Sequence, residues 1–365
     1  DQWTASGVDI KWGDARLTAQ GSSGAHTNLT WILNAPTLSV FNDQLSGDAL
    51  LSGSYTATQA VPQVSLQIKS NQVGYQGIQL KELKLATLLD LSNQNQSMLE
   101  VTAQRITHEQ SALTNVKLVG EGRVNDHELI LQAQAVNPWL PESMQVKMKL
   151  GAGYDKGIWQ GSIESLQADD TKRNVFAGLL DKASFILSEH HSQLEQLCLT
   201  VGKGKVCATG DWQRDQLGRI GWRANMDIDS LPVTLRNSKL IDGARLETKI
   251  QGRIMLAAEL GMPWKGESDL KLQDASIYYR SVAGRDESLP IEMGQMHLLA
   301  SEQAVRADGE LRAGEQTVGA FDVSLDRTQG TEFSEHPLSG VMTLSSSDAK
   351  FIPVFIPEAV SYTHL

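Results

Sequence analysis

Apolar and polar residues alternate in short runs over most of the chain. In 64–69, Val, Leu and Ile alternate with Ser, Gln and Lys, and the same pattern recurs in 129–135, 146–150 and 321–325. Because successive side chains of a strand point to opposite faces, each run predicts a β-strand with one apolar and one polar face. Helical spacing of apolar residues does not continue beyond about two turns anywhere.

Turn-forming residues separate these runs. Asn125-Asp126 divides 118–124 from 128–135, and Asn93-Gln94-Asn95 divides 85–91 from 98–102, while Gly309 indicates a further break. Roughly twenty strand-like segments with short connections predict an antiparallel meander of the all-β class. A slip in the alternation within 78–85 predicts a bulge or a tight bend.

Three apolar segments contain proline, at 138–141, 231–235 and 352–357. A proline cannot donate to a sheet ladder, so we expect loops or short helical turns there and no central strand. With these breaks the chain divides into blocks 1–137, 138–231 and 232–360. The last five residues, 361–365, continue no pattern, and we expect them to be a non-native tail.

The two cysteines lie on either side of a predicted hairpin turn. A two-residue loop at Gly202-Lys203 places Cys198 opposite Cys207 in a non-hydrogen-bonded pair, with Cα atoms about 4.5 Å apart. That separation fits a disulfide, which favours an oxidising compartment. Two buried free thiols, or half of a metal site near His190-His191, are the alternatives. A zinc site needs about four ligands, which this region lacks.

Composition narrows the functional classes. The chain has 365 residues, 41 % of them hydrophobic, and a formal net charge of −11, which argues against disorder and against broad nucleic-acid binding. Glycine pairs at 120/122, 151/153 and 202/204 imitate nucleotide-binding loops, but strands follow them, so we expect hairpin turns. No catalytic motif is present, and the sequence predicts neither an enzyme nor a cofactor. No apolar stretch approaches the ~18 residues of a membrane span, and the chain is expected to be a piece of a longer protein.

The order of motifs in the middle of the chain resembles one family. Residues 157–166 are followed by the cysteine pair with Gly210-Asp211-Trp212, then by 231–235 and 243–252. This order resembles the central region of the TamB family, the inner-membrane-anchored subunits of the translocation and assembly module of Gram-negative bacteria. The family belongs to the AsmA-like bridge-like lipid-transfer proteins. The resemblance is strongest over 156–270, and the cysteine pair is its most specific element.

The resemblance implies a fold and a role. The fold is a long antiparallel sheet bent into a U-shaped hydrophobic groove, a β-taco, whose concave face carries phospholipid acyl chains across the periplasm between the inner and outer membranes. It also implies an N-terminal anchor in the inner membrane and a C-terminal region that meets a TamA-like outer-membrane barrel. Both would lie outside this chain. The expected location is therefore periplasmic.

The apolar positions of the clearest alternating runs are the residues that we expect to line such a groove: Leu66, Ile68, Leu129, Leu131, Val146, Met148, Leu150, Phe321, Val323 and Leu325. The alternative is a closed β-sandwich that acts as a binding or adhesion module of the cell envelope, because the same alternation can build a dry core. A transmembrane barrel is disfavoured by the scarcity and placement of aromatic residues.

Overall fold

A computed structural model describes residues 3–24, 26–58, 61–136, 143–170, 175–236, 245–280, 285–313, 317–327 and 337–346. These residues form 24 strands and one three-residue 3-10 helix, and every strand pairing among them is antiparallel. The predicted all-β class is therefore confirmed. Within the described ranges, no helix has the length and hydrophobicity that crossing a membrane requires.

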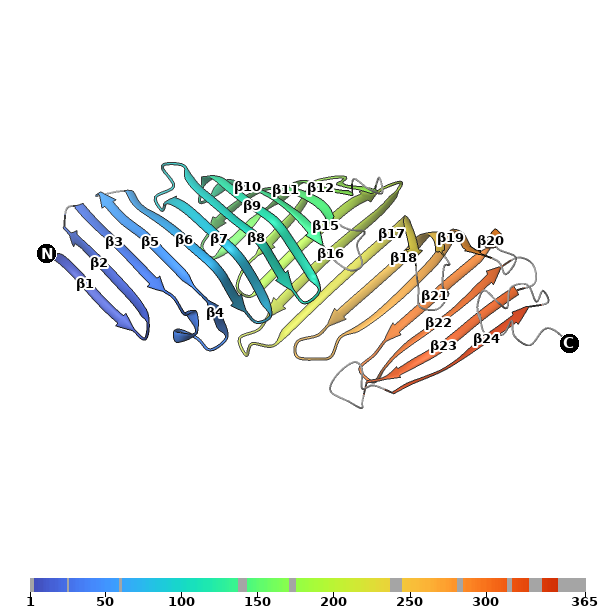
Figure 1. Cartoon of the computed structure of the whole chain (residues 1–365). Coiled ribbons are helices and arrows are strands. Elements are labelled where there is room, and N and C mark those ends of the chain that lie inside the picture. Colours follow the sequence, from blue (N-terminus) through green and yellow to red (C-terminus); the bar gives the residue numbers. More distant parts are fainter. Residues whose placement is uncertain are drawn as a thin grey trace. The chain divides into compact units, whose positions relative to one another are not determined.

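The chain divides into two units, 1–188 and 189–365. In the first unit most strands pair with the strands before and after them in the chain, as a meander does (Figure 1). Its elements are β1 (Trp3–Trp12), β2 (Ala15–Ser23), β3 (His26–Ala35), η1 (Leu38–Val40), β4 (Leu45–Gly47), β5 (Ala49–Thr58), β6 (Val61–Tyr75), β7 (Ile78–Asp90), β8 (Ser97–His108), β9 (Ser111–Arg123), β10 (Asp126–Val136), β11 (Ser143–Asp155), β12 (Ile158–Asp170), β13 (Val175–Leu179) and β14 (Ala183–Leu187).

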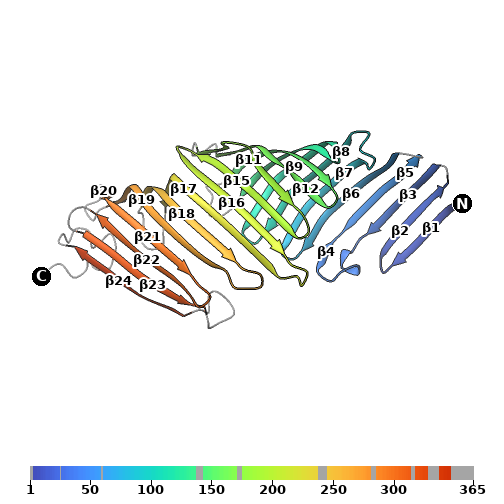
Figure 2. The same ribbon diagram turned by 180° about the vertical axis from the view of Figure 1, so that it is seen from behind.

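The second unit repeats this organisation, and its strands are clearest from behind (Figure 2). They are β15 (His191–Val201), β16 (Gly204–Arg214), β17 (Ile220–Arg236), β18 (Arg245–Ala258), β19 (Lys265–Arg280), β20 (Asp286–Ile291), β21 (Met293–Ala300), β22 (Ala304–Ala313), β23 (Thr317–Asp326) and β24 (Leu338–Ser346). Strand β19 pairs with β20 along its second half and with β21 along its first.

Four strands contain a left-handed residue that interrupts the regular pairing. Glu82 in β7, Asn115 in β9, Ser230 in β17 and Asp274 in β19 have φ of 50°, 51°, 54° and 49°. The pairing register shifts beside Asn115, Ser230 and Asp274, whereas at Glu82 the ladder is interrupted and resumes in the same register. Glu82 confirms the irregularity predicted within 78–85. Because a bulge bends its strand and increases the local twist, these positions curve the sheets.

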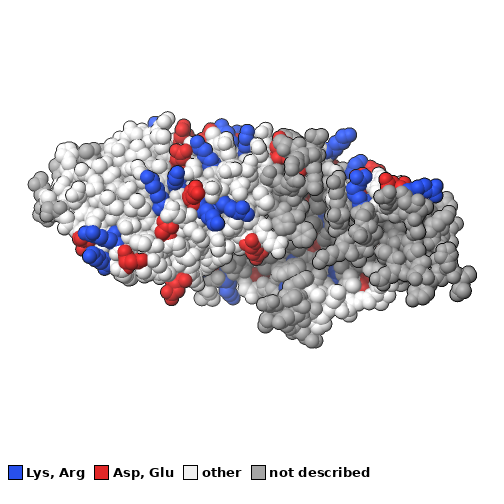
Figure 3. All heavy atoms as spheres, in the orientation of Figure 1, with Lys and Arg blue, Asp and Glu red and all other residues white. Residues whose placement is uncertain are grey.

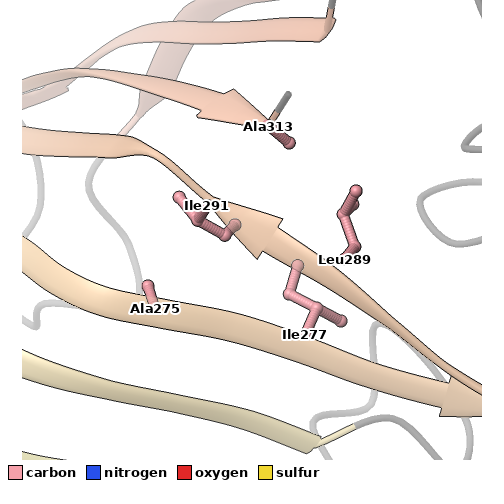
Figure 4. Close-up of a cluster of buried hydrophobic side chains, with 5 residues drawn as sticks. All are labelled: Ala275, Ile277, Leu289, Ile291 and Ala313. Atoms are coloured by element: carbon pink, nitrogen blue, oxygen red, sulfur yellow. The ribbon is translucent and has the colours of Figure 1, made fainter. Parts of the chain in front are cut away.

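A packed cluster lies beside the bulges in each unit. In the first unit it consists of Ala103, Val116 and Ala133. In the second unit it consists of Ala275, Ile277, Leu289, Ile291 and Ala313, whose side chains converge from three strands (Figure 4). Ala275 pairs with Ile291, and Ile277 with Leu289, so the cluster fastens β20 to β19 directly after the Asp274 bulge.

One of the three predicted proline breaks is wrong. The segment 231–235 is neither a loop nor a helical turn, because it continues β17 and pairs with β18 from Leu231 to Arg236. The described pairing of β17 with β16 ends at Asp229. At Pro232, β18 is therefore the only described strand that pairs with β17. Proline is tolerated there because no hydrogen bond to a second strand depends on a backbone N–H at this position. The segments 138–141 and 352–357 and the tail 361–365 lie outside the described residues.

Several glycines predicted in turns or at a break lie inside strands. Gly120 and Gly122 belong to β9, Gly151 and Gly153 to β11, and Gly309 to β22, whereas Gly202 does form the hairpin turn, with φ +58°. The reason is steric. A Cβ at 309 would lie 2.6 Å from Cε1 of Phe321, so the glycine leaves room for a neighbouring ring. Gly309 thus serves packing within a strand.

The bulge at Asp274 yields a stability prediction. A left-handed backbone costs an L-residue about 1–2 kcal/mol and a β-branched residue more, whereas Asn and Gly tolerate it. We expect Asp274→Val to lower the free energy of unfolding of the second unit by about 1–3 kcal/mol, and Asp274→Asn to change it by less than about 1 kcal/mol. Urea unfolding followed by circular dichroism measures both. Asp322→Val, in ordinary strand backbone of β23, is the control, and an equal loss there would contradict the assignment.

Candidate functional site: apolar rows across the strands

One row of aliphatic side chains crosses the first unit from β1 to β12. Residues that pair directly across neighbouring strands lie on the same face of a sheet, so the registers define the row. Its members are Ile10, Leu17, Leu33, Leu51, Ile68, Leu85, Val101, Leu118, Leu131, Met148 and Leu166, one from each strand except β4. With a spacing of about 4.8 Å between strands, the row extends roughly 50 Å. We call it the middle row.

A second row runs beside the middle row, two residues along each of most strands. It contains Val8, Ala19, Trp31, Gly53, Leu66, Thr87, Leu99, Gly120, Leu129, Leu150 and Ile163. Its two glycines lie beside large neighbours: a Cβ at 53 would clash with the Trp31 ring, and one at 120 with the Leu129 side chain. Apart from the Thr87 hydroxyl, which donates to the carbonyl oxygen of Met98, the row contains no polar side chain, so its surface is largely apolar.

The structure brings the seven predicted lining residues of the first unit onto this one face. Ile68, Leu131 and Met148 belong to the middle row, and Leu66, Leu129 and Leu150 to the second row. Val146 lies on the other side of the middle row, between Ala133 and Ala168. Sequence reasoning missed the remaining members of both rows, because only the register identifies which strands meet.

The second unit has its own apolar rows, which contain the other three predicted residues. Phe321 belongs to a row that contains Leu199, Val206, Ile228, Gly252, Leu270, Met296 and Gly309 before it and Met342 after it. Val323 follows Leu298 and Ala307 in the next row, and Leu325 follows Ala300 and Val305 in a third. Each unit therefore presents one apolar face built from parallel rows.

The large aliphatic side chains of these faces are mostly half-buried. Leu129 is 8 % exposed, but the other nine predicted lining residues are all in the intermediate range. In the first unit the buried hydrophobic residues are mainly alanines, at positions such as 15, 35, 49, 103, 133 and 168. A closed sandwich buries its largest aliphatic residues most deeply, and the described part of the first unit does the opposite.

The opposite face carries the charges of the first unit's later strands. Lys117 approaches Glu100 to 3.4 Å, and the Lys149 ammonium lies 2.6 Å from Glu128 and 3.4 Å from Glu164. The hydrogen bond to Glu128 raises the pKa of Lys149, and that from Lys182 lowers the pKa of Glu164. These exposed pairs contribute little stability, but they distinguish a solvated face from the apolar one.

The disulfide lies on the polar face of the second unit. Cys198 and Cys207 are bonded, with Cα atoms 4.0 Å apart, and they pair directly across β15 and β16. The same row continues through Asp227, Arg253 and Asp269. Arg253 donates to Asp227 at 2.6 Å, and this hydrogen bond raises the pKa of the guanidinium. Leu199 and Val206, the next pair along, point to the apolar face.

An aromatic cluster closes one edge of the first unit's apolar face. Trp159 donates its indole N–H to His127 Nε2 at 3.0 Å, and its ring meets Phe185 edge-on, with centroids 6.1 Å apart. His127 Nδ1 lies 3.2 Å and 3.1 Å from the carbonyl oxygens of Arg123 and Val124, which fixes the Nδ1–H tautomer. The imidazole is therefore held as a structural hydrogen-bonding partner.

His190 and His191, the other metal candidates from sequence, do not form a metal site with the cysteines. His191 Nε2 lies 3.0 Å from Asp211 Oδ2 at the start of β15, and the cysteines are bonded to each other. Nowhere in the described ranges do three His, Cys, Asp or Glu side chains gather in a way that could hold a metal ion. The arrangement therefore provides a long apolar surface on one face of the sheet and solvated charged side chains on the other.

Comparison with known proteins places this architecture in a family. The family model described as "TamB, N-terminal domain" matches residues 1–362. The chain belongs to the TamB family. The part that matches is described as an N-terminal domain, whereas the sequence resemblance indicated a central region. TamB proteins are transport and assembly subunits of the cell envelope, and the family is not one of enzymes.

A curated relative is the translocation and assembly module subunit TamB of Haemophilus influenzae. It is 20 % identical over 237 residues, which cover 62 % of this chain and 17 % of that protein. The chain therefore spans less than a fifth of the length of this relative. No solved structure matches the chain.

The disulfide yields a prediction about register. A one-residue slip between β15 and β16 would move Leu199 and Val206 to the polar face, and the bond prevents it. Replacing both cysteines by alanine should lower the free energy of unfolding of the second unit by up to about 2–3 kcal/mol. Amide hydrogen exchange should quicken in β15 and β16 first.

Reduction of the unaltered protein by dithiothreitol is the control for this change. It should produce the same exchange pattern, and it should have no effect on the double alanine variant. Unchanged exchange in β15 and β16 after reduction would show that the strand register does not depend on the bond.

Proposed function

We propose that this chain is a segment of a periplasmic lipid conduit, and that its apolar rows carry the acyl chains of phospholipids along the sheet between the inner and outer membranes. The observation that carries the proposal is the middle row, in which eleven directly paired strands each contribute Leu, Ile, Val or Met without interruption. Membership of the TamB family and the name of the Haemophilus influenzae relative support a role in a translocation and assembly module.

The energetics favour a lipid tail on such a surface. Removing apolar groups from water yields about 0.8 kcal/mol per CH₂, so contact with a continuous aliphatic strip stabilises a tail without any specific polar contact. The rows run across the strands, so a tail lying along them meets the same chemistry at every strand. Such a surface permits movement along the row, because no position binds much more tightly than the next.

The half-exposed state of the rows also favours lipid over a protein core. A binding or adhesion module built as a sandwich would bury Ile68, Leu131 and Met148 most deeply, yet these side chains are only half-buried while alanines nearby are fully buried. Apolar surface that the described residues leave partly accessible is available to a mobile ligand. The partners that this role implies are a TamA-like outer-membrane barrel and the inner membrane.

Site-specific photo-crosslinking tests the proposal. A photoreactive side chain at Ile68, Leu131 or Met148 should capture phospholipid in living Gram-negative cells, and mass spectrometry of the adduct identifies the headgroup. The matched controls are Lys69, Gln132 and Lys147, which lie one residue along the same strands. Gln132 pairs with both Lys117 and Lys147 on the polar face.

The two sets of positions separate the outcomes. Adducts confined to the apolar set support the conduit, and adducts at the polar set alone would refute it. Absence of lipid adducts at all six positions, in a protein that folds normally, would favour the sandwich module.

A further inference from the structure

One end of the first unit carries exposed aromatic side chains on three separate connections. Trp12 at the β1–β2 turn is 64 % exposed, Phe41 after η1 is 40 % exposed, and Tyr75 and Ile78 at the β6–β7 turn are 41 % and 40 % exposed. The three connections lie at the same edge of the blue strands (Figure 1). We call these four residues the aromatic rim.

Contacts between the connections hold the aromatic rim in place. The Trp12 and Phe41 rings meet edge-on with centroids 5.8 Å apart, and Thr37 donates its hydroxyl to Asp14 at 2.6 Å. Leu45, in β4, pairs with Tyr75 and so joins the second connection to the third. The rim is therefore a preorganised surface, and its aromatic side chains lose little conformational freedom when they bind something.

The aromatic rim continues the apolar face. Trp12 lies two residues beyond Ile10, the first member of the middle row, so both side chains point to the same side of β1. Tyr75 lies two residues beyond Val73, which pairs with Leu80 and, through it, with Ile106, a side chain that packs against the cluster of Ala103, Val116 and Ala133. A ligand on the rim thus borders the first strands of the apolar rows.

Charge is sparse in this part of the chain. Between positions 17 and 68 the only charged residues are Asp43 and Asp48, and the polar positions of β3 and β5 are mainly Ser, Thr and Asn. Figure 3 shows the strands of this part as largely free of charged side chains, which gather instead along the lower edge. Asp9 and Arg16 form an ion pair at 2.6 Å, and Lys11 is outnumbered by Asp14, Asp43 and Asp48. An anionic surface would therefore gain nothing here.

We propose that the aromatic rim docks on the surface of a lipid bilayer with neutral, zwitterionic headgroups. Tryptophan, tyrosine and phenylalanine combine a large apolar area with, in the first two, a polar atom, and they concentrate at the boundary between headgroups and acyl chains. Trp12 and Phe41 insert to that depth, and β3 and β5, which carry no Lys, Arg, Asp or Glu, approach the bilayer with little cost in desolvation. The inference does not rest on lipid transport, although it would bring bilayer lipid beside the apolar rows.

Flotation of the whole chain with phosphatidylcholine vesicles tests the docking. We expect the protein to float with the vesicles equally at low and high salt, and to bind phosphatidylglycerol vesicles no more tightly. The double variant Trp12→Ser with Phe41→Ser should lower the partition coefficient about tenfold or more, since two large side chains no longer leave water. Tyr75→Ser with Ile78→Ser provides a second, independent pair.

The control removes equally exposed apolar residues elsewhere. Leu217 and Met262 are 80 % and 51 % exposed in loops of the second unit, and serine at both positions should leave flotation unchanged. Circular dichroism and urea unfolding identify any variant that fails to fold. Flotation that needs anionic lipid, that disappears at high salt, or that survives both rim variants would overturn the docking.

Self-association is the remaining competitor for the aromatic rim. If sedimentation shows a dimer that the rim variants dissociate, while the unaltered chain ignores phosphatidylcholine vesicles, the rim binds a second copy and the proposal is wrong. Lipid crosslinking at Ile68 is a separate result, so failure of docking and failure of the conduit can be told apart.

Discussion

The structure depends on keeping one face of the sheet apolar from strand to strand. Alternation within a strand separates the two faces, but only the register between strands joins Leu17 to Leu33 and Leu33 to Leu51 in a row. A slip by one residue would exchange the faces of a strand. Tight turns, the disulfide of β15 and β16 and the packed clusters beside the bulges all oppose such a slip.

Bulges reconcile that constraint with curvature. A strand that bends without a bulge would have to distort the backbone angles of many residues, whereas a bulge confines the distortion to one left-handed residue. Asn115 and Asp274 are each followed by small or aliphatic side chains that pack where the strand has turned, Val116 and Ala275. The sheets are thus shaped at a few defined positions, and the rows between them stay regular.

The sequence was sufficient for the fold class, the hairpin of the cysteines and the irregularity at Glu82, because alternation and turn residues are local signals. The sequence did not predict that Pro232 lies in a strand, because proline is tolerated there only where β16 no longer pairs with β17. It was also insufficient at Gly309, because the glycine makes room for Phe321 on the neighbouring strand. Both predictions were wrong because they used only the residues next to each position in the sequence, whereas the neighbouring strand determines the role of that position.

The same limit explains why ten lining residues were predicted and the rows were not. Leu51, Leu85 and Val101 lie in less regular sequence than Ile68 or Met148, yet pairing places them in one line with these residues. A conduit for lipid tails depends on the continuity of the middle row and not on any single residue in it. Substituting one aliphatic residue for another should therefore be tolerated within a row, whereas a charge in the row would interrupt the apolar line across the strands.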